Sequence, residues 1–66
     1  MREPYNTASI TELAATPGTL KRLLRKGDVI YTSQEDRPQI EKFLRIENVR
    51  FTSAIEAYDL SVVTIS

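Results

Sequence analysis

A phrase that the chain uses twice constrains its fold more than any other feature. Residues 29–33 read VIYTS and are followed by QED, while residues 49–53 read VRFTS and are followed by AIE. Each copy is a short run of β-branched and aromatic residues that leads into Ser-x-x-acid, the capping box that starts many helices. The sequence therefore predicts a strand that passes into a helix at two places, twenty residues apart.

For the whole chain the prediction is an α+β fold, with two short N-terminal helices followed by a β-α-β-α-β segment that forms a small three-stranded sheet. Residues 1–8 are expected to be an irregular arm, because Pro4 and Asn6 discourage regular structure, and residues 9–66 a single small domain. Helices are expected at about 10–15, 20–26, 35–46 and 54–59, and strands at 29–33, 49–53 and 61–65.

The lengths of the two connections predict how the strands run. A crossover of about 15 residues between the first two strands allows a parallel, right-handed β-α-β unit. The second link, of about seven residues, is too short for an ordinary parallel crossover. The last strand is therefore expected to return antiparallel or to lie at an edge of the sheet.

Local signals place the helix ends and the core. Ser9 and Glu12 form a third capping box, Gly27 is expected in a left-handed conformation just past the second helix, and Pro38 fits only the first turn of the third. Tyr31 and Phe51 hold equivalent places in the repeated phrase and are expected on one face of the sheet. The residues predicted to be largely buried are Leu23, Val29, Tyr31, Ile40, Leu44, Phe51 and Val63.

Composition excludes most chemistry. The 66 residues include no cysteine and no histidine, so a disulfide scaffold and the commonest nucleophiles, bases and zinc ligands are missing. Glu35, Asp36 and Glu41 are the densest acidic group, but Asp36 is more simply a helix cap. Two glycines cannot form a phosphate-binding glycine loop. We therefore predict a protein that is not an enzyme and needs no cofactor or metal.

Chain length and hydropathy predict the oligomeric state and the cellular location of the protein. A chain this short buries only about 60% of its unfolded surface, so a homodimer is a natural way to gain stability. No apolar run approaches the roughly 20 residues of a membrane span, and none follows Met1 as in a signal peptide. The expected setting is cytoplasmic, with no membrane partner.

The best candidates for contact with a partner, whether protein or phosphate, are four basic residues and a tyrosine. Lys21, Arg22, Arg25 and Lys26 fall opposite Leu20, Leu23 and Leu24 on the second predicted helix. Four cations in six residues can grip phosphates or an acidic protein surface, and the alternative is a solvated helix face. Tyr58, and with it Tyr5, lies in a segment expected to be exposed, where tyrosines favour interfaces.

Residues 9–39 resemble the N-terminal domain of Phd/YefM-type antitoxins. The matching features are Ser9-Ile10-Thr11-Glu12-Leu13, an amphipathic helix that ends at Gly27, a strand that ends at Thr32, and Arg37-Pro38. The chain departs from that family at Pro17-Gly18, in the helical spacing after Pro38, and in its apolar C-terminal strand. The resemblance implies a dimer that binds operator DNA, with Lys21, Arg22 and Arg25 near phosphates. A helix-turn-helix reading is weaker, because the turn after the first helix is too short.

Two functions follow from these observations. The first is a small non-enzymatic regulatory module that binds another protein, of the inhibitor or adaptor type that phages and mobile elements often encode. The alternative is a DNA-binding, antitoxin-like transcriptional autoregulator of the Phd/YefM type. The net charge of zero argues against tight non-specific binding to nucleic acid and favours the first.

Overall fold

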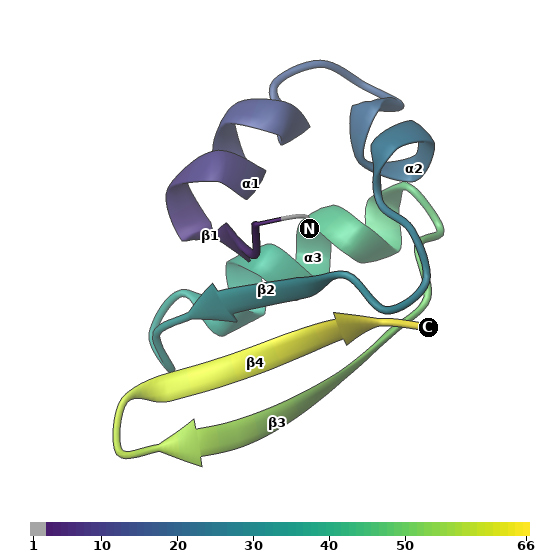
Figure 1. Cartoon of the computed structure of the whole chain (residues 1–66). Coiled ribbons are helices and arrows are strands. Elements are labelled where there is room, and N and C mark those ends of the chain that lie inside the picture. The colour runs from purple at the N-terminus through teal and green to yellow at the C-terminus, as the bar shows by residue number, and fades with distance from the viewer. Residues whose placement is uncertain (1–2) are drawn as a thin grey trace.

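The computed structural model describes residues 3–66 as three helices and a four-stranded mixed sheet (Figure 1). In chain order the elements are β1 (Tyr5–Asn6), α1 (Thr7–Ala14), α2 (Thr19–Leu23), β2 (Val29–Thr32), α3 (Arg37–Ile46), β3 (Phe51–Ala57) and β4 (Leu60–Ile65). The α+β class is confirmed, but the three-stranded sheet is wrong, because β1 adds a strand within the predicted arm. Residues 1 and 2 of that arm lie outside the described residues.

The strand order is β1-β2-β4-β3, so the last strand in the chain lies inside the sheet. β1 is parallel to β2, and both β2 and β3 are antiparallel to β4. The predicted antiparallel return of the last strand is confirmed. The predicted parallel β-α-β unit is only partly correct. The strands before and after α3, β2 and β3, are parallel, but they are not neighbours, because β4 lies between them.

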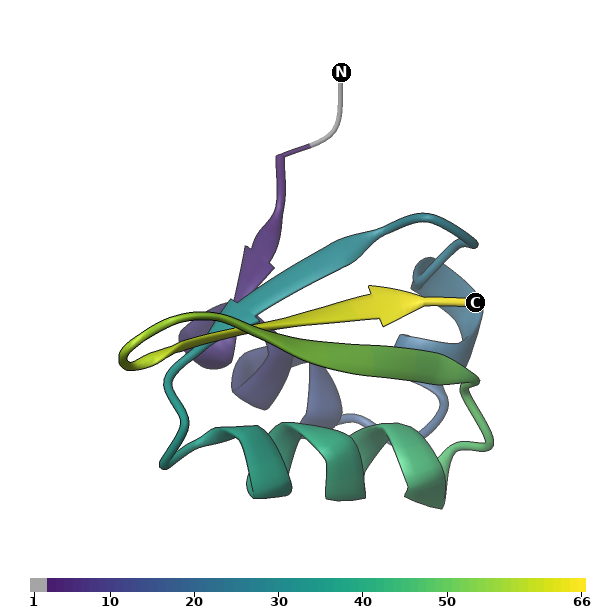
Figure 2. The same cartoon turned by 90° about the horizontal axis from the view of Figure 1, so that it is seen from below.

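All three helices cover the same face of the sheet and leave the other face open (Figure 2). Burial along β4 alternates accordingly, with Ser61, Val63 and Ile65 buried and the residues between them only partly so. Between the sheet and the helices lies one apolar core, as expected for two packed layers. Its buried members are Ile10, Leu20, Leu24, Ile30, Ile40, Leu44, Val49, Val63 and Ile65.

The helix predicted at 54–59 is wrong, because this segment continues β3 and then turns. Ala54 pairs with Val62, and a turn at Tyr58 and Asp59 closes the β3–β4 hairpin. Ser53 does not cap a helix; its hydroxyl donates to Glu41 at 3.0 Å. A helix of about six residues is not stable by itself, whereas the Val-rich β4 offers a ladder of backbone hydrogen bonds.

The first copy of the repeated phrase passes from a strand into a helix, as predicted, and Pro38 lies in the first turn of α3. The predicted cap is wrong: α3 begins at Arg37 with Asp36 as its N-cap and no side-chain cap hydrogen bond, and the Ser33 hydroxyl accepts from the Asp36 amide at 3.1 Å in the preceding turn. At α1 the cap differs from the prediction. Asn6, rather than Ser9, is the N-cap, and Ser9 is the reciprocal partner that accepts from the Asn6 amide at 2.9 Å. An Asn side chain offers the same capping oxygen as Ser, so the helix begins at Thr7, earlier than expected.

The second helix ends earlier than predicted, because Leu24 adopts an extended conformation. Arg25 and Lys26 therefore lie in a loop rather than in a last helical turn. Gly27 has the expected positive φ, 94°, but four residues past the helix, in the turn that leads into β2. Its amide donates to the Ile65 carbonyl at 2.8 Å, so the loop is held against the end of β4 and cannot continue as a helix.

The predicted core is correct at its centre and wrong at the sheet face. Ile40, Leu44 and Val63 are fully buried, while Val29 and Phe51 are only partly so. Tyr31 is exposed, because it pairs with Val62 on the open face, whereas Phe51 pairs with Ile65 on the helix side. The two aromatic residues therefore lie on opposite faces, with β4 between their strands. Leu23 is exposed because the extended Leu24 takes the core position beside Leu20.

Candidate functional site

The four predicted basic residues are all exposed, and we refer to them together as the basic surface. Lys21 and Arg22 lie on α2, and Arg25 and Lys26 follow in the loop. Lys21 is held in place, since its Nζ donates to the Asn48 carbonyl oxygen at 3.1 Å. The Arg25 amide donates to the Asp28 carboxylate at 2.9 Å, which fixes the loop backbone while the guanidinium stays at the surface.

A shallow pocket of about 210 Å³ adjoins this basic surface. Its lining includes Lys21 and Lys26 together with Arg50, which the sequence prediction missed. Arg50 lies between α3 and β3, more than twenty residues along the chain, so no local pattern could have grouped it with the others. Three cations around one hollow favour an anionic group, and we name this hollow the cationic pocket.

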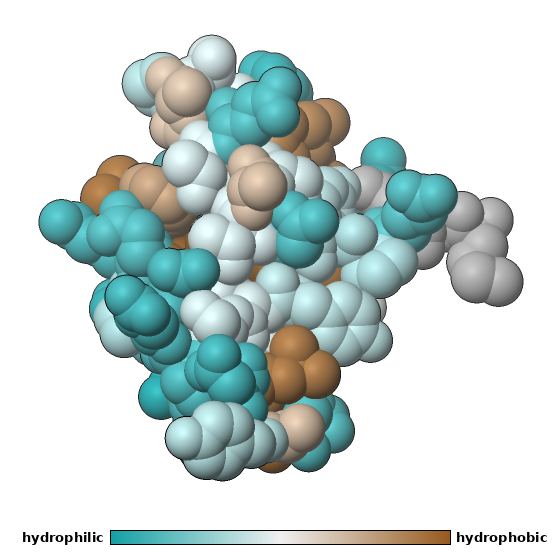
Figure 3. Space-filling model, turned by 90° about the vertical axis from the view of Figure 1, so that its left-hand side faces the viewer, coloured by the Kyte–Doolittle hydropathy of each residue, from teal (hydrophilic) through white to brown (hydrophobic). Residues whose placement is uncertain are grey.

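Tyr58 does not belong to that surface. It lies in the β3–β4 turn, at the opposite end of the sheet from α2, and is 98% exposed (Figure 1). In the view of that end, apolar groups are scattered among hydrophilic ones rather than gathered into a patch (Figure 3). Tyr5, which we expected to be exposed, instead packs against the core from β1. The predicted contact residues therefore make two separate regions and not one site.

The open face of the sheet is a third candidate surface, which the sequence prediction did not single out. Alternation along the strands places two residues from β2, two from the regular part of β3 and three from β4 on this face, and none of these seven is charged. Tyr31, 43% exposed, is the largest of them, and it also lines a hollow of about 350 Å³ beside β1, together with the acidic residues Glu3 and Asp28. The seven are Val29, Tyr31, Thr52, Ala54, Leu60, Val62 and Thr64.

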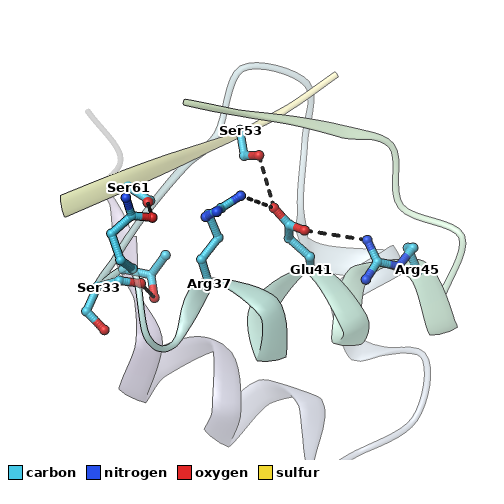
Figure 4. Close-up of polar contacts among 8 residues, drawn as sticks. Ser33, Arg37, Glu41, Arg45, Ser53 and Ser61 are labelled. Atoms are coloured by element: carbon cyan, nitrogen blue, oxygen red, sulfur yellow. Dashed lines mark hydrogen bonds and ion pairs between the residues drawn. The ribbon is translucent and has the colours of Figure 1, made fainter. Parts of the chain in front are cut away.

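The most connected polar group, Glu41, serves the fold. Its carboxylate accepts from Arg37 at 3.3 Å and from Ser53 at 3.0 Å, and lies 3.6 Å from Arg45 (Figure 4). Only the Ser53 contact joins α3 to β3, while the two arginines lie on α3 itself, and together the three contacts engage both carboxylate oxygens. Among residues 3–66 no three acidic side chains come close enough to hold a metal ion.

Comparison with protein-family models, with curated proteins and with solved structures gives no match for this chain. The resemblance of residues 9–39 to Phd/YefM-type antitoxins therefore stays a prediction. Within residues 3–66 no helix is both long enough and apolar enough to cross a membrane.

Proposed function

We propose that this protein is a small non-enzymatic regulatory module that binds another protein, of the inhibitor or adaptor type, through the open face of its sheet. The observation that supports this most is the uncharged, helix-free face around Tyr31. Centres of protein interfaces are depleted of charged residues and enriched in tyrosine. A rigid sheet also presents such residues with little loss of conformational entropy on binding.

The chemistry of this face also indicates the kind of partner. Val62 lies beside the tyrosine on β4, with Val29 two residues away on β2 and Ala54 beyond Val62 on β3, while Thr52 and Thr64 supply hydroxyls. A neutral protein surface with its own apolar anchor suits these groups. Nucleic acid suits them poorly, since a phosphate backbone needs several cations, and the β3–β4 register places only Arg50, just before β3, on this side of the sheet.

A second candidate, the DNA-binding antitoxin-like autoregulator, has one specific observation in its favour. The cationic pocket brings Arg50 to Lys21 and Lys26, with Arg22 and Arg25 exposed nearby. This places five cations at one end of a neutral molecule. Such an end can hold phosphates even though the whole chain carries no net charge.

Affinity capture from the native host separates the two functions. Wild type, Tyr31→Ser and the double variant Lys21→Gln/Arg25→Gln are compared with and without nuclease. We expect a protein partner that nuclease leaves bound, that the double variant retains and that Tyr31→Ser loses by tenfold or more in a titration with the purified partner. Gln39→Ala, an exposed change on α3, is the control and should bind like wild type. Capture that nuclease abolishes would instead support the DNA candidate.

A further inference from the structure

The two edges of the sheet are protected very differently. The β1 edge is only two residues long, and Pro4 precedes it. The β3 edge is seven residues long, and six of those residues are exposed. Proteins usually blunt a long edge with Lys, Pro or an early bulge, but residues 51–55 contain none of these. The β3 edge is therefore open to another strand.

The hydrogen-bonding pattern shows which residues face that edge. The Arg50 carbonyl accepts from the Ser66 amide at 3.0 Å, so the backbone groups of Arg50 point toward β4. In an antiparallel ladder this direction alternates along the strand. The amides and carbonyls of Phe51, Ser53 and Ile55 therefore point away from β4, until a bulge between Ile55 and Ala57 ends the regular run. Ser53 is the midpoint of that run.

We propose that a second copy of this chain pairs with the β3 edge, antiparallel and about a two-fold axis at Ser53. In this register Phe51 lies opposite Ile55 of the other copy, and Thr52 lies opposite Ala54. The three outward-facing residues of each strand exchange their amides and carbonyls across the axis. The product is one continuous sheet with the order β1-β2-β4-β3-β3-β4-β2-β1.

Charge complementarity selects this register. Arg50 and Glu56 flank the regular run, both are exposed, and neither side chain has a hydrogen bond or ion pair within residues 3–66. With the axis at Ser53, Arg50 of each copy faces Glu56 of the other. If the register moves by two residues in either direction, Arg50 lies opposite Tyr58 or Ala54 of the other copy. Glu56 of each copy then no longer faces an arginine. Opposite charges across an antiparallel pair stabilise it, and like charges oppose it.

Apolar exposure supports the same pairing. Ile55 is 64% exposed, and opposite Phe51 of the other copy it gains an apolar neighbour on the helix side of the sheet. Ile46, 66% exposed, ends α3 near the start of β3, on that same side (Figure 2). The interface is narrow, because one strand pair buries less than the roughly 1,200 Å² of a standard stable interface. The dimer is therefore concentration-dependent.

Charge reversal tests the register directly. Arg50→Glu places like charges opposite each other twice in its own homodimer, and Glu56→Arg does the same with the opposite sign. We expect each variant alone to dimerise at least about tenfold more weakly than wild type in analytical ultracentrifugation. An equimolar mixture of the two variants restores both opposite-charge pairs, so we expect it to dimerise like wild type.

A proline tests the edge independently of charge. Ser53→Pro removes an amide that points away from β4, so it blocks pairing with a second copy and spares the hairpin. Ser53→Ala, the matched control, removes the same hydroxyl contact with Glu41 but keeps the amide. We expect the alanine variant to dimerise and the proline variant to stay monomeric, with circular dichroism confirming that both are folded. If the proline variant does not fold, the mixture of Arg50→Glu and Glu56→Arg still tests whether two copies pair through the β3 edge.

Three outcomes would overturn the proposal. Wild type that stays monomeric up to about 1 mM would exclude the dimer. Dimerisation by folded Ser53→Pro would exclude the β3 edge. A mixture of Arg50→Glu and Glu56→Arg that dimerises no better than either variant alone would exclude the register. None of these outcomes affects the proposed protein-binding function, which rests on the open face and is tested with a different partner.

Discussion

Single residues hold the turns of this chain in conformations that most side chains avoid. Gly27 has a φ of 94° and Asn48 a φ of 58°. Asn48 follows α3, where the Val49 amide donates to the Leu44 carbonyl at 2.9 Å and closes the helix end. Glycine and asparagine are the residues that adopt left-handed conformations most readily. These two positions therefore set the direction in which the chain enters β2 and β3.

Replacing Gly27 tests the first of these turns. Gly27→Val forces a β-branched side chain into a left-handed conformation, so we expect a loss of stability on the order of 1–2 kcal/mol. The measurement is the midpoint of thermal unfolding. Gly27→Asn is the matched control and should lose less, because asparagine tolerates this conformation. A valine variant that melts at the wild-type temperature would contradict the assignment.

The core offers a sharper comparison between two leucines. Leu44 is fully buried, whereas Leu23 is 40% exposed. We expect Leu44→Ala to cost roughly 2–5 kcal/mol, a large part of the stability of a small domain. Leu23→Ala removes the same atoms from a position with less contact and should cost clearly less. Denaturant unfolding of both variants measures the difference, and equal losses would show that the burial of these two side chains is assigned wrongly.

At the scale of elements, Glu41 joins α3 to β3. Its hydrogen bond with Ser53 crosses between the two elements, while its ion pairs with Arg37 and Arg45 lie along the helix. Hydrogen bonds of this kind contribute about 0.5–1.5 kcal/mol, and exposed i,i+4 ion pairs about 0.3–0.5 kcal/mol each. The connection between α3 and β3 therefore depends mainly on Ser53.

A double-mutant cycle tests this connection. We expect Glu41→Ala to lower the free energy of unfolding by about 1–2 kcal/mol and Ser53→Ala by about 1 kcal/mol. The loss in the double variant should fall short of the sum by the energy of the shared hydrogen bond. Exactly additive losses in denaturant unfolding would mean that Glu41 and Ser53 do not interact. Only the ion-pair part of the Glu41→Ala effect should shrink at high salt.

The sequence predicted best the elements that depend on local signals. Pro38 and the spacing of Ile40 and Leu44 were enough for α3, because cap, first turn and buried face lie within one segment. The same Ser-x-x-acid pattern failed at Ser53, because the distant β4 decides the structure there. The same distinction applies to the candidate sites. Lys21 and its basic neighbours are close in the sequence and could be predicted as a group. Arg50 and the open face around Tyr31 could not, because they depend on how distant strands pair.

At the scale of the whole molecule, the neutral chain has five of its nine cations in or near the cationic pocket, while the open face of the sheet lies elsewhere. DNA binding through the cationic pocket would weaken with salt, with a log–log slope near −0.9 for each phosphate neutralised. Binding through the open face would depend less on salt, because its central strand residues are uncharged and the nearby charges, Glu3, Asp28 and Arg50, lie at its margins.

A gel-shift titration at two salt concentrations measures this. Random DNA and the protein's own promoter are compared, and we expect no specific shift with either. If a shift occurs, Lys21→Gln/Arg25→Gln should make the salt slope shallower by about two units while the fold survives. Promoter-selective, salt-sensitive binding of the wild type would favour the autoregulator over the proposed protein-binding module.

The place of β4 in the strand order has a consequence for synthesis. β4 is the last element along the chain, yet it separates β2 from β3 and supplies the ladder for both. While the chain emerges from the ribosome, β3 has no strand to pair with and β2 has only the two residues of β1, until residues 60–65 have left the exit tunnel. The sheet therefore forms after translation of β4 and not during the synthesis of the strands that precede it, and a chain stopped at Asp59 would leave the ribosome with its core uncovered.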